Sequence, residues 1–280
     1  MSGDADTARS LFGLDGRRVL VIGGGQGMGE ATARLLAGLG CAVAVMDLEA
    51  DRAARVADAI ATAGGAAWPI AADVLDDQAL TEAIDRTERD FGPLDGLATI
   101  VGMAGWASIL DTTPEIWDHD HRRNLRYVFV AAREVARRMI AREAGGSMAM
   151  VASVDGMRSA RMHVSYGAAK AGLINMVRTM AVEWAPHHIR VNCVAPGPIV
   201  TPRIPLRDAE SELRGMERIP MQRRGCTDDI ARAVAFFLSD MTPFVTGQTL
   251  AVDGGYLAAD LFNLSHGAKS GGTLGMEASG

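Results

Sequence analysis

The sequence has few cysteines and no histidine pattern typical of a metal site. Its three cysteines, Cys41, Cys193 and Cys226, are odd in number and far apart. Because Cys41 and Cys193 lie in apolar segments, we expect buried thiols in a reducing compartment rather than disulfides. His119 and His121 are two residues apart on one expected helix, so they face different ways. The sequence therefore argues against a disulfide scaffold and predicts no metal.

Long apolar runs and clusters of basic residues are also missing. The N-terminus carries Asp4 and Asp6 and lacks the apolar core of a secretory signal. The longest low-charge stretch, 97–110, has fourteen residues, fewer than the roughly 20 that cross a bilayer. The 28 basic residues are scattered and are outnumbered by 34 acidic ones, for a net charge of −6. We expect a soluble, cytoplasmic protein with no membrane or nucleic-acid partner.

What is present is an ordinary globular composition, with 48% hydrophobic and 22% charged residues. Apolar runs alternate with segments of helical spacing, at 18–22, 41–46, 67–71, 96–101, 147–152, 189–194 and 248–252. This alternation predicts an α/β fold: a single-domain, doubly wound (Rossmann), mostly parallel sheet with helices on both faces. We expect the domain to span 1–256. Residues 257–280 should form a tail, partly disordered or docked on a neighbouring subunit.

A glycine-rich turn directly follows the first apolar run. The segment Gly23-Gly-Gly-Gln-Gly-Met-Gly29 joins that strand to a helix expected over 30–39. The buried side of this helix is expected to hold Ala31, Leu35, Leu36 and Leu39. Glycines let the backbone approach a pyrophosphate, whose charge the helix N-terminus meets. Strand, glycine turn, helix and strand form the dinucleotide fingerprint, although a glycine-rich loop alone often serves only a tight turn.

The second apolar run ends in Asp47, eighteen residues beyond Gly29. In the dinucleotide fingerprint, a carboxylate at this place accepts hydrogen bonds from the adenosine ribose. It also repels a 2′-phosphate, and Gln26 in the turn adds no cation. NAD is therefore favoured over NADP. Read alone, Asp47 would be only a polar residue that ends a strand.

Tyr166 and Lys170 lie four residues apart, thirteen residues after Ser153. At this spacing both project from one helix face, so an ammonium can sit beside a phenol. A phenol titrates near 10, and acid–base work near neutral pH needs a shift of about 4 kcal/mol. A unit charge about 4 Å away supplies that much at an effective dielectric of about 20. A lone Tyr-x-x-x-Lys is usually a solvated helix face, but together with the glycine turn it predicts hydride transfer.

With these motifs the chain resembles the single-domain branch of the short-chain dehydrogenase/reductase family, from about Leu14 to Tyr256. The family's glycine loop matches Gly23, Gly27 and Gly29. The resemblance implies that the catalytic residues are Asn124, Ser153, Tyr166 and Lys170. It further implies that the cofactor is bound by Gly23, Gln26, Gly27, Met28, Gly29, Asp47, Asp73, Val74, Gly102, Tyr166, Lys170, Pro196, Gly197, Ile199 and Thr201.

In the family's mechanism, as the resemblance implies it, Tyr166 exchanges a proton with the substrate oxygen. Lys170 depresses the pKa of the phenol and bonds the nicotinamide ribose. Ser153 hydrogen-bonds the same substrate oxygen and offsets its developing charge. Asn124 would hold a water that passes the proton outward past Lys170.

Two departures from the family pattern concern the sheet and the cofactor. Ile22 stands where a threonine is usual, and Gly102-Met-Ala-Gly105 replaces Asn-Asn-Ala-Gly. The missing groups normally brace the sheet and the adenosine side. These departures bear on the tightness of cofactor binding rather than on the fold.

The substrate is less constrained than the chemistry. Residues expected to contact it are Ser153, Asp155, Met157, His163 and Tyr166, with Met103, Trp106, Met162 and Ile199 nearby. Methionines and a tryptophan fit an adaptable apolar pocket for an alicyclic, aromatic or steroid-like alcohol or ketone. Packing in the core is an equal alternative for half of them. Arginines also follow these motifs, and they instead fit an anionic carrier, as in a 3-oxoacyl-thioester reductase: Arg158, Arg161, Arg203 and Arg207. A non-catalytic NAD-binding protein is a third alternative, which the complete catalytic set argues against.

Two further expectations concern a lid and an assembly. The irregular stretch 198–225 follows the Pro-Gly turn beside the nicotinamide and is expected to be a lid. Two helices carry more apolar residues than one sheet face needs, namely Val128, Val135, Met139, Leu173, Met176, Val177 and Met180. Because soluble monomers avoid large apolar patches, we expect a closed homo-oligomer, foremost the homotetramer common in this branch of the family.

Overall fold

A computed structural model of the chain describes residues 11–259. Within them, seven strands form one sheet in the order β3-β2-β1-β4-β5-β6-β7, and every neighbouring pair is parallel. The strands are β1 (Arg18–Ile22), β2 (Ala42–Asp47), β3 (Ala66–Ala71), β4 (Gly96–Thr99), β5 (Gly146–Val151), β6 (Ile189–Pro196) and β7 (Thr249–Val252). Each strand coincides with an apolar run of the sequence. The doubly wound α/β fold is therefore confirmed, with a sheet that is parallel throughout.

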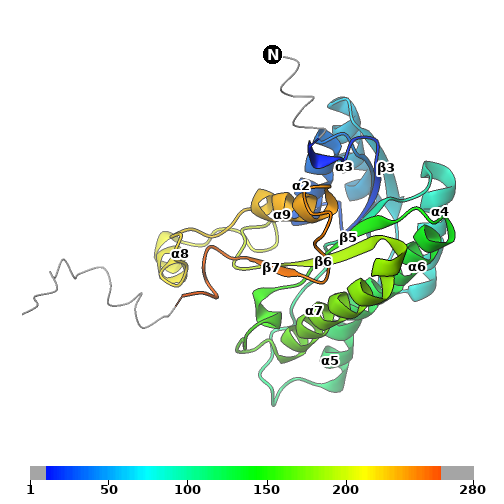
Figure 1. Cartoon of the computed structure of the whole chain (residues 1–280). Coiled ribbons are helices and arrows are strands. Elements are labelled where there is room, and N and C mark those ends of the chain that lie inside the picture. Colours follow the sequence, from blue (N-terminus) through cyan, green and yellow to red (C-terminus); the bar gives the residue numbers. More distant parts are fainter. Residues whose placement is uncertain (1–10, 260–280) are drawn as a thin grey trace, which may run out of the picture.

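Helices cover both faces of this sheet (Figure 1). One face carries α2 (Gly27–Gly38), α3 (Ala50–Thr62) and α9 (Thr227–Leu238), whose buried residues share one core cluster. The other face carries α4 (Asp77–Phe91), α6 (Tyr127–Ala141) and α7 (Val164–Trp184), which share a second cluster. The shorter elements are α5 (Pro114–His121), α8 (Ala209–Met216), a π-helical turn η1 (Arg122–Arg126), and the 3₁₀ turns η2 (Val154–Gly156) and η3 (Ala185–His187).

The first helix differs in detail from the sequence prediction. It begins at Gly27, inside the glycine turn, and its buried side includes Thr32, Ala33 and Leu36. Of the four residues predicted to be buried there, only Leu36 is buried. The other three, Ala31, Leu35 and Leu39, are half-buried. The prediction missed Thr32 because a buried hydroxyl is costly without a partner. Here the hydroxyl donates to the Met28 carbonyl at 2.7 Å.

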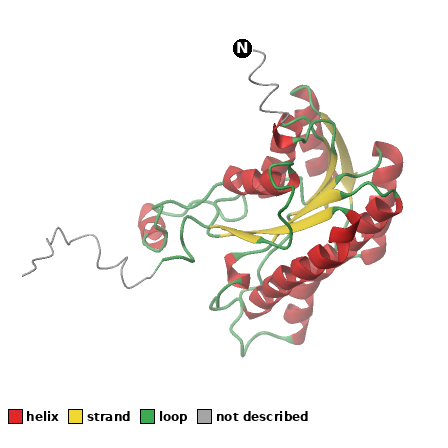
Figure 2. Cartoon of the chain, in the orientation of Figure 1, coloured by secondary structure: helices red, strands yellow, loops and turns green. Residues whose placement is uncertain are grey.

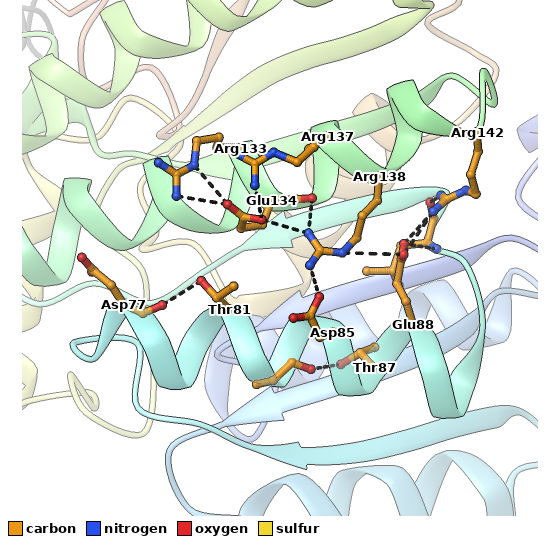
Figure 3. A network of polar contacts seen from close by, with 12 residues as sticks. Asp77, Thr81, Asp85, Thr87, Glu88, Arg133, Glu134, Arg137, Arg138 and Arg142 are labelled. Atoms are coloured by element: carbon orange, nitrogen blue, oxygen red, sulfur yellow. Dashed lines mark hydrogen bonds and ion pairs between the residues drawn. The ribbon is translucent and has the colours of Figure 1, made fainter.

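An ionic network joins α4 to α6 (Figure 3). Glu134 on α6 is 5% exposed and accepts from Arg133, Arg137 and Arg138 at 3.1–3.2 Å. Arg138 also reaches Asp85 on α4. One turn further, Arg142 binds Glu88 at 2.9 Å. These bonds hold α6 against α4, and η1 continues directly into α6.

The apolar argument for an oligomer was wrong. Six of the seven residues behind it are buried within this single chain: Val128, Val135, Met139, Leu173, Val177 and Met180. The seventh, Met176, packs at the edge of the same core cluster. One sheet face therefore uses the apolar surface that we had assigned to another subunit. The homotetramer stays a prediction that rests on the family resemblance.

The segment 198–225 is not wholly irregular, because it contains α8, which projects from the body of the molecule together with its flanking loops (Figure 2). The Asp208 carboxylate caps α8 by accepting from the Ser211 amide at 2.9 Å. Arg224 ties the base of the segment together, since it donates to Glu212 at 3.1 Å and to the Ile199 carbonyl at 2.8 Å. The segment is therefore anchored at its base, while α8 stands away from the sheet.

The remaining expectations concern membranes, metals, cysteines and the tail. Between residues 11 and 259, no helix is long and apolar enough to cross a membrane, and no cluster of metal-ligating side chains forms. Cys41 and Cys193 are buried free thiols, and Cys226 is exposed. The predicted tail falls almost entirely beyond residue 259, outside the described residues.

Candidate active site

A cleft of about 1400 Å³ lies at the carboxyl ends of the central strands. It includes the switch point between β1 and β4, where the strand order reverses and where open parallel sheets bind ligands. Of the predicted cofactor residues, those that line it are Gly23, Gln26, Gly27, Met28, Asp47, Asp73, Val74, Gly102, Tyr166, Pro196, Gly197, Ile199 and Thr201. Only Gly29 and Lys170 do not line the cleft.

The glycine turn presents backbone amides to this cleft. Gln26, the N-cap of α2, makes no side-chain bond to the first amides of that helix, which are therefore available to an anion. Gly29 lies behind the turn, where an added Cβ would be 1.8 Å from the Gly23 carbonyl oxygen. Gly29 therefore permits close packing of helix against turn rather than contact with a ligand.

Asp47 lies at the expected place but is already bound. One carboxylate oxygen accepts from the Arg52 guanidinium at 2.8 and 3.0 Å, and the other accepts from the Gly25 amide at 3.0 Å. Asp47 is 7% exposed and Arg52 lines the same cleft. The sequence analysis missed Arg52, although a position five residues after Asp47 on the following helix was a usable signal. The guanidinium offsets the carboxylate charge on which the preference for NAD was based.

A second cation reaches the glycine turn from the segment after β6. With the amide of Gln26 oriented so that both its oxygen and its nitrogen are satisfied, the oxygen accepts two bonds from Arg203 at 3.1 Å. Gln26 supplies no cation itself, but its partner does. This contact links the predicted lid to the turn that would hold a pyrophosphate.

Lys170 is buried behind Tyr166. Its ammonium donates to the Val151 carbonyl at 2.8 Å and lies 5.7 Å from the centre of the Tyr166 ring. Burial lowers the pKa of Lys170 to about 8. Burial also raises the pKa of Tyr166 to about 12, with the charges of Asp155 and Asp120 adding to the rise and the Ser153 hydroxyl opposing it.

The direction of this shift contradicts the sequence analysis, which expected Lys170 to depress the pKa of Tyr166. The ammonium points at the Val151 carbonyl rather than at the phenol oxygen. Burial raises the pKa of the phenol, and the charges of Asp155 and Asp120 add to the rise against the Ser153 hydroxyl. Within the protein alone, the phenol is therefore a weaker acid than a free tyrosine.

Ser153 and Asn124 lie in two different settings. Ser153 follows β5, lines the cleft, and accepts from the Asp155 amide at 3.1 Å. Asn124 is buried in η1, and its amide nitrogen donates at 2.9 Å to the carbonyls of Met103 and Asp120. Its oxygen accepts from the Met103 amide at 3.1 Å. One amide hydrogen of Asn124 thus braces the loop after β4 and the other bonds α5, so neither is available to hold a water.

Gly102 separates Asn124 from Lys170. A Cβ at Gly102 would lie 3.0 Å from the Asn124 oxygen and 3.1 Å from the Lys170 nitrogen. The glycine therefore lets the loop after β4 pass close to both polar groups, in a position where the family usually has a larger residue.

Asp120 is a buried residue of the site that the sequence analysis missed. Its carboxylate accepts from the Gly105 amide at 3.1 Å and from the Ser165 hydroxyl at 2.5 Å, and Arg123 lies 3.5 Å away. It therefore joins α5, the loop after β4 and α7. Its spacing of four residues before Asn124 on one helix face was the available signal. Together they brace a loop that lacks the family's two asparagines.

The predicted substrate residues divide between two cavities. Seven of them line the main cleft, namely Ser153, Tyr166, Ile199, Met103, Trp106, Asp155 and His163. Met157 and Met162 line a neighbouring cavity of about 750 Å³, which shares Asp155 and Arg158 with the main cleft. A contact of Met157 with the substrate therefore stays a prediction.

Tyr256 completes one wall of the main cleft. Its hydroxyl accepts from Arg158 at 2.6 Å, and the guanidinium of Arg158 lies 4.3 Å from its ring centre. Arg161, Arg203 and Arg207 also line the cleft. The sequence analysis placed these arginines near the substrate but had no signal for the pairing of Arg158 with Tyr256.

Comparison with known proteins gives consistent matches. The family model described as Enoyl-(Acyl carrier protein) reductase matches residues 23–257. A cis-4-hydroxycyclohexanecarboxylate dehydrogenase of Sinomonas cyclohexanicum is 37% identical, covering 86% of this chain and 97% of the relative. A 2-(S)-hydroxypropyl-CoM dehydrogenase of Xanthobacter autotrophicus is 34% identical, covering 86% and 96%. The crystal structure of a short-chain type dehydrogenase/reductase from Mycobacterium marinum superposes with a TM-score of 0.84 at 31% identity, covering 89% and 99%.

Proposed function

This chain belongs to the short-chain dehydrogenase/reductase family, and we propose that it transfers a hydride between NAD(H) and a secondary alcohol or ketone. One observation carries the proposal: Ser153 and Tyr166 line the same cleft as the glycine turn, with Lys170 directly behind the phenol. A dinucleotide on the turn and a carbonyl at Tyr166 would then share one continuous space.

The cleft fits a nicotinamide cofactor, which supplies or accepts the hydride when it is bound. The uncapped amides of α2 suit its pyrophosphate, Asp47 its adenosine ribose, and Asp73 and Val74 its adenine. Thr201 and Ile199 would contact the nicotinamide end. Lys170 would turn from the Val151 carbonyl toward the nicotinamide ribose.

In reduction, Tyr166 donates its phenolic proton to the carbonyl oxygen, and in oxidation it accepts the proton of the alcohol. Ser153 hydrogen-bonds the same oxygen and offsets its developing charge. For proton exchange with solvent, Asn124 would hold a water that passes the proton outward past Lys170. Both amide hydrogens of Asn124 are used within the protein, so such a water would donate to an Asn124 oxygen.

We propose NAD as the cofactor because Asp47 ends β2, where the dinucleotide fingerprint has the carboxylate that bonds the adenosine ribose. Arg52 and Arg203 add positive charge at the same end of the cleft, so we expect a moderate preference rather than an absolute one. The ratio of kcat/KM for NAD to that for NADP measures this preference directly.

For the substrate we propose an alicyclic, aromatic or steroid-like alcohol or ketone, since Met103 and Trp106 form an apolar wall near Tyr166. The hydroxycyclohexanecarboxylate dehydrogenase among the relatives acts on an alicyclic substrate by its name. A 3-oxoacyl thioester is the second candidate, favoured by the arginines that line the cleft. The complete catalytic set argues against a non-catalytic NAD-binding protein.

A screen of ketones, secondary alcohols and 3-oxoacyl thioesters, with NAD(H) and NADP(H), tests the proposal through NADH absorbance. We expect turnover of cyclic secondary alcohols. Turnover of thioesters alone would replace the first candidate by the second. Binding of NAD without turnover of any compound would contradict an enzymatic function.

We also propose a cytoplasmic homotetramer. Light scattering at micromolar concentration distinguishes it from a monomer, whose mass is 29.5 kDa. A mass near that of one chain would overturn the assembly and leave the proposed chemistry intact.

A further inference from the structure

Beside Tyr166 lies a polar pair that hydride transfer does not use. The Nδ1 atom of His163 lies 2.8 Å from a carboxylate oxygen of Asp155. The other ring nitrogen, Nε2, is buried and has no hydrogen-bond partner among the described residues. His163 and Asp155 both line the main cleft, and their side chains are 13% and 14% exposed. A buried polar atom without a partner is rare in folded proteins and calls for an explanation.

The pair stands between the reacting group and an exposed indole. The ring centres of His163 and Tyr166 are 5.7 Å apart, and those of His163 and Trp106 are 4.2 Å apart, edge to face. Trp106 is 72% exposed, so its side chain can move without disturbing the core. A ligand whose oxygen contacts Tyr166 would lie next to His163.

Asp155 determines whether Nε2 donates or accepts a hydrogen bond. An ionised carboxylate only accepts hydrogen bonds, so the proton of the neutral imidazole is on Nδ1. Nε2 then carries a lone pair and accepts a hydrogen bond. The group that satisfies it is a donor, such as a hydroxyl.

We propose that Nε2 of His163 accepts a hydrogen bond from a second hydroxyl of the substrate, so that the preferred alcohol is a vicinal diol, and the preferred ketone an α-hydroxyketone. This inference rests on the proposed function of the cleft. It assigns His163 a role in substrate recognition and Asp155 the role of a positioning residue that sets the tautomer of His163. Trp106 covers the ring of such a substrate.

The charges around the pair favour a neutral hydroxyl over an anion. Asp155 bonds Nδ1, so the ring presents the lone pair of Nε2 to the ligand. The guanidinium of Arg158 is 3.9 Å from Asp155 and stacks on Tyr256. A substrate carboxylate at Nε2 would bring oxygen lone pairs against this nitrogen lone pair, whereas a hydroxyl would donate to it.

Discrimination is expected to be large, because a buried group that is built to bond a hydroxyl is left unpaired by a substrate without one. We expect the wild-type kcat/KM for cyclohexane-1,2-diol, as its better isomer, to exceed that for cyclohexanol by about 100-fold or more. The ratio of these two constants is the readout, because it cancels effects on Tyr166 chemistry that both substrates share.

Two variants at one position form a matched pair. His163→Phe keeps an aromatic ring against Trp106 but removes the acceptor, and the ratio should fall to within about tenfold of unity. His163→Gln keeps an acceptor and should retain a larger ratio than the phenylalanine variant. The affinity for NAD, measured by protein fluorescence, reports whether each variant is folded.

The outcomes separate this inference from the proposed function. If wild-type protein oxidises neither alcohol, nor any other compound of the screen, the proposed function fails. If it oxidises cyclohexanol and the diols equally well and His163→Phe leaves the ratio unchanged, only the role of His163 is overturned. If a hydroxycyclohexanecarboxylate is preferred over both diols and His163→Phe removes that preference, the pair binds an anion as an imidazolium, and the diol proposal is wrong.

Discussion

Replacing Lys170 by methionine should abolish turnover and yet stabilise the protein in the absence of a cofactor. Lys170 is 1% exposed, and its ammonium has one hydrogen bond, to the Val151 carbonyl, among the described residues. Burial lowers its pKa from 10.5 to about 8. This difference corresponds to about 3 kcal/mol of unfavourable burial of the charge. The variant also loses the hydrogen bond to the Val151 carbonyl, which lowers its stability by about 1 kcal/mol. Its free energy of unfolding should therefore exceed that of wild type by about 2 kcal/mol near neutral pH.

The pH dependence follows from the direction of the shift. Below pH 8 or so, Lys170 is protonated in both the folded and the unfolded chain, and the full penalty is present. Between about 8 and 10.5 the folded protein releases the proton while the unfolded chain keeps it, so the penalty fades as the pH rises. The stability difference between Lys170→Met and wild type should therefore be largest near neutral pH and shrink above it.

Thermal and urea unfolding at neutral pH and at about pH 9.5 test this reasoning. A gain of about 2 kcal/mol should raise Tm by roughly 4 °C or more. Lys170→Ala is the control: it also removes the charge but leaves a cavity, and it should impair both turnover and NAD binding. A methionine variant that is less stable than wild type near neutral pH, or a gain that does not change with pH, would refute the argument from burial.

Three other predictions concern the cofactor, the loop and the helix layer. Asp47→Ala should narrow the preference for NAD, and Arg52→Ala should sharpen it; equal kcat/KM ratios in both variants and wild type would contradict the assigned roles. Asp120→Ala leaves the Gly105 amide and the Ser165 hydroxyl without their acceptor and should cost about 2–4 kcal/mol in urea unfolding. Glu134→Gln should lower the free energy of unfolding by about 2 kcal/mol in the same measurement, since three arginines lose their buried counter-charge. An unchanged urea midpoint in Asp120→Ala or Glu134→Gln would contradict the stabilising role assigned to that residue.

The features that were predictable from the sequence are those with a fixed local period. The strands appear as short apolar runs, because strands of a parallel sheet are buried on both faces. The Tyr-x-x-x-Lys spacing places two side chains on one helix face whatever the rest of the chain does. Asp47 ends a buried strand and Ser153 follows another, so the fold brings them to the same edge of the sheet.

What the sequence analysis missed depends on contacts between distant elements. Arg203 reaches Gln26 only because the segment after β6 crosses the cleft. Met157 was assigned to the pocket by its proximity to Ser153, and sequence proximity could not show that its side chain lines a neighbouring cavity. The pKa of Tyr166 was misjudged for a related reason, since helical spacing says nothing of the carbonyl to which Lys170 points.

The central claim is that Tyr166 is the acid–base group of an NAD-dependent alcohol oxidoreductase, and Tyr166→Phe tests it most directly. The measurement is the rate of NADH formation with the best alcohol of the screen, beside the affinity for NAD. We predict a rate about 10²–10⁴-fold below that of wild type, because such catalysis contributes that much, and an affinity for NAD within a few fold. A variant that keeps more than about a tenth of the wild-type rate would contradict the claim.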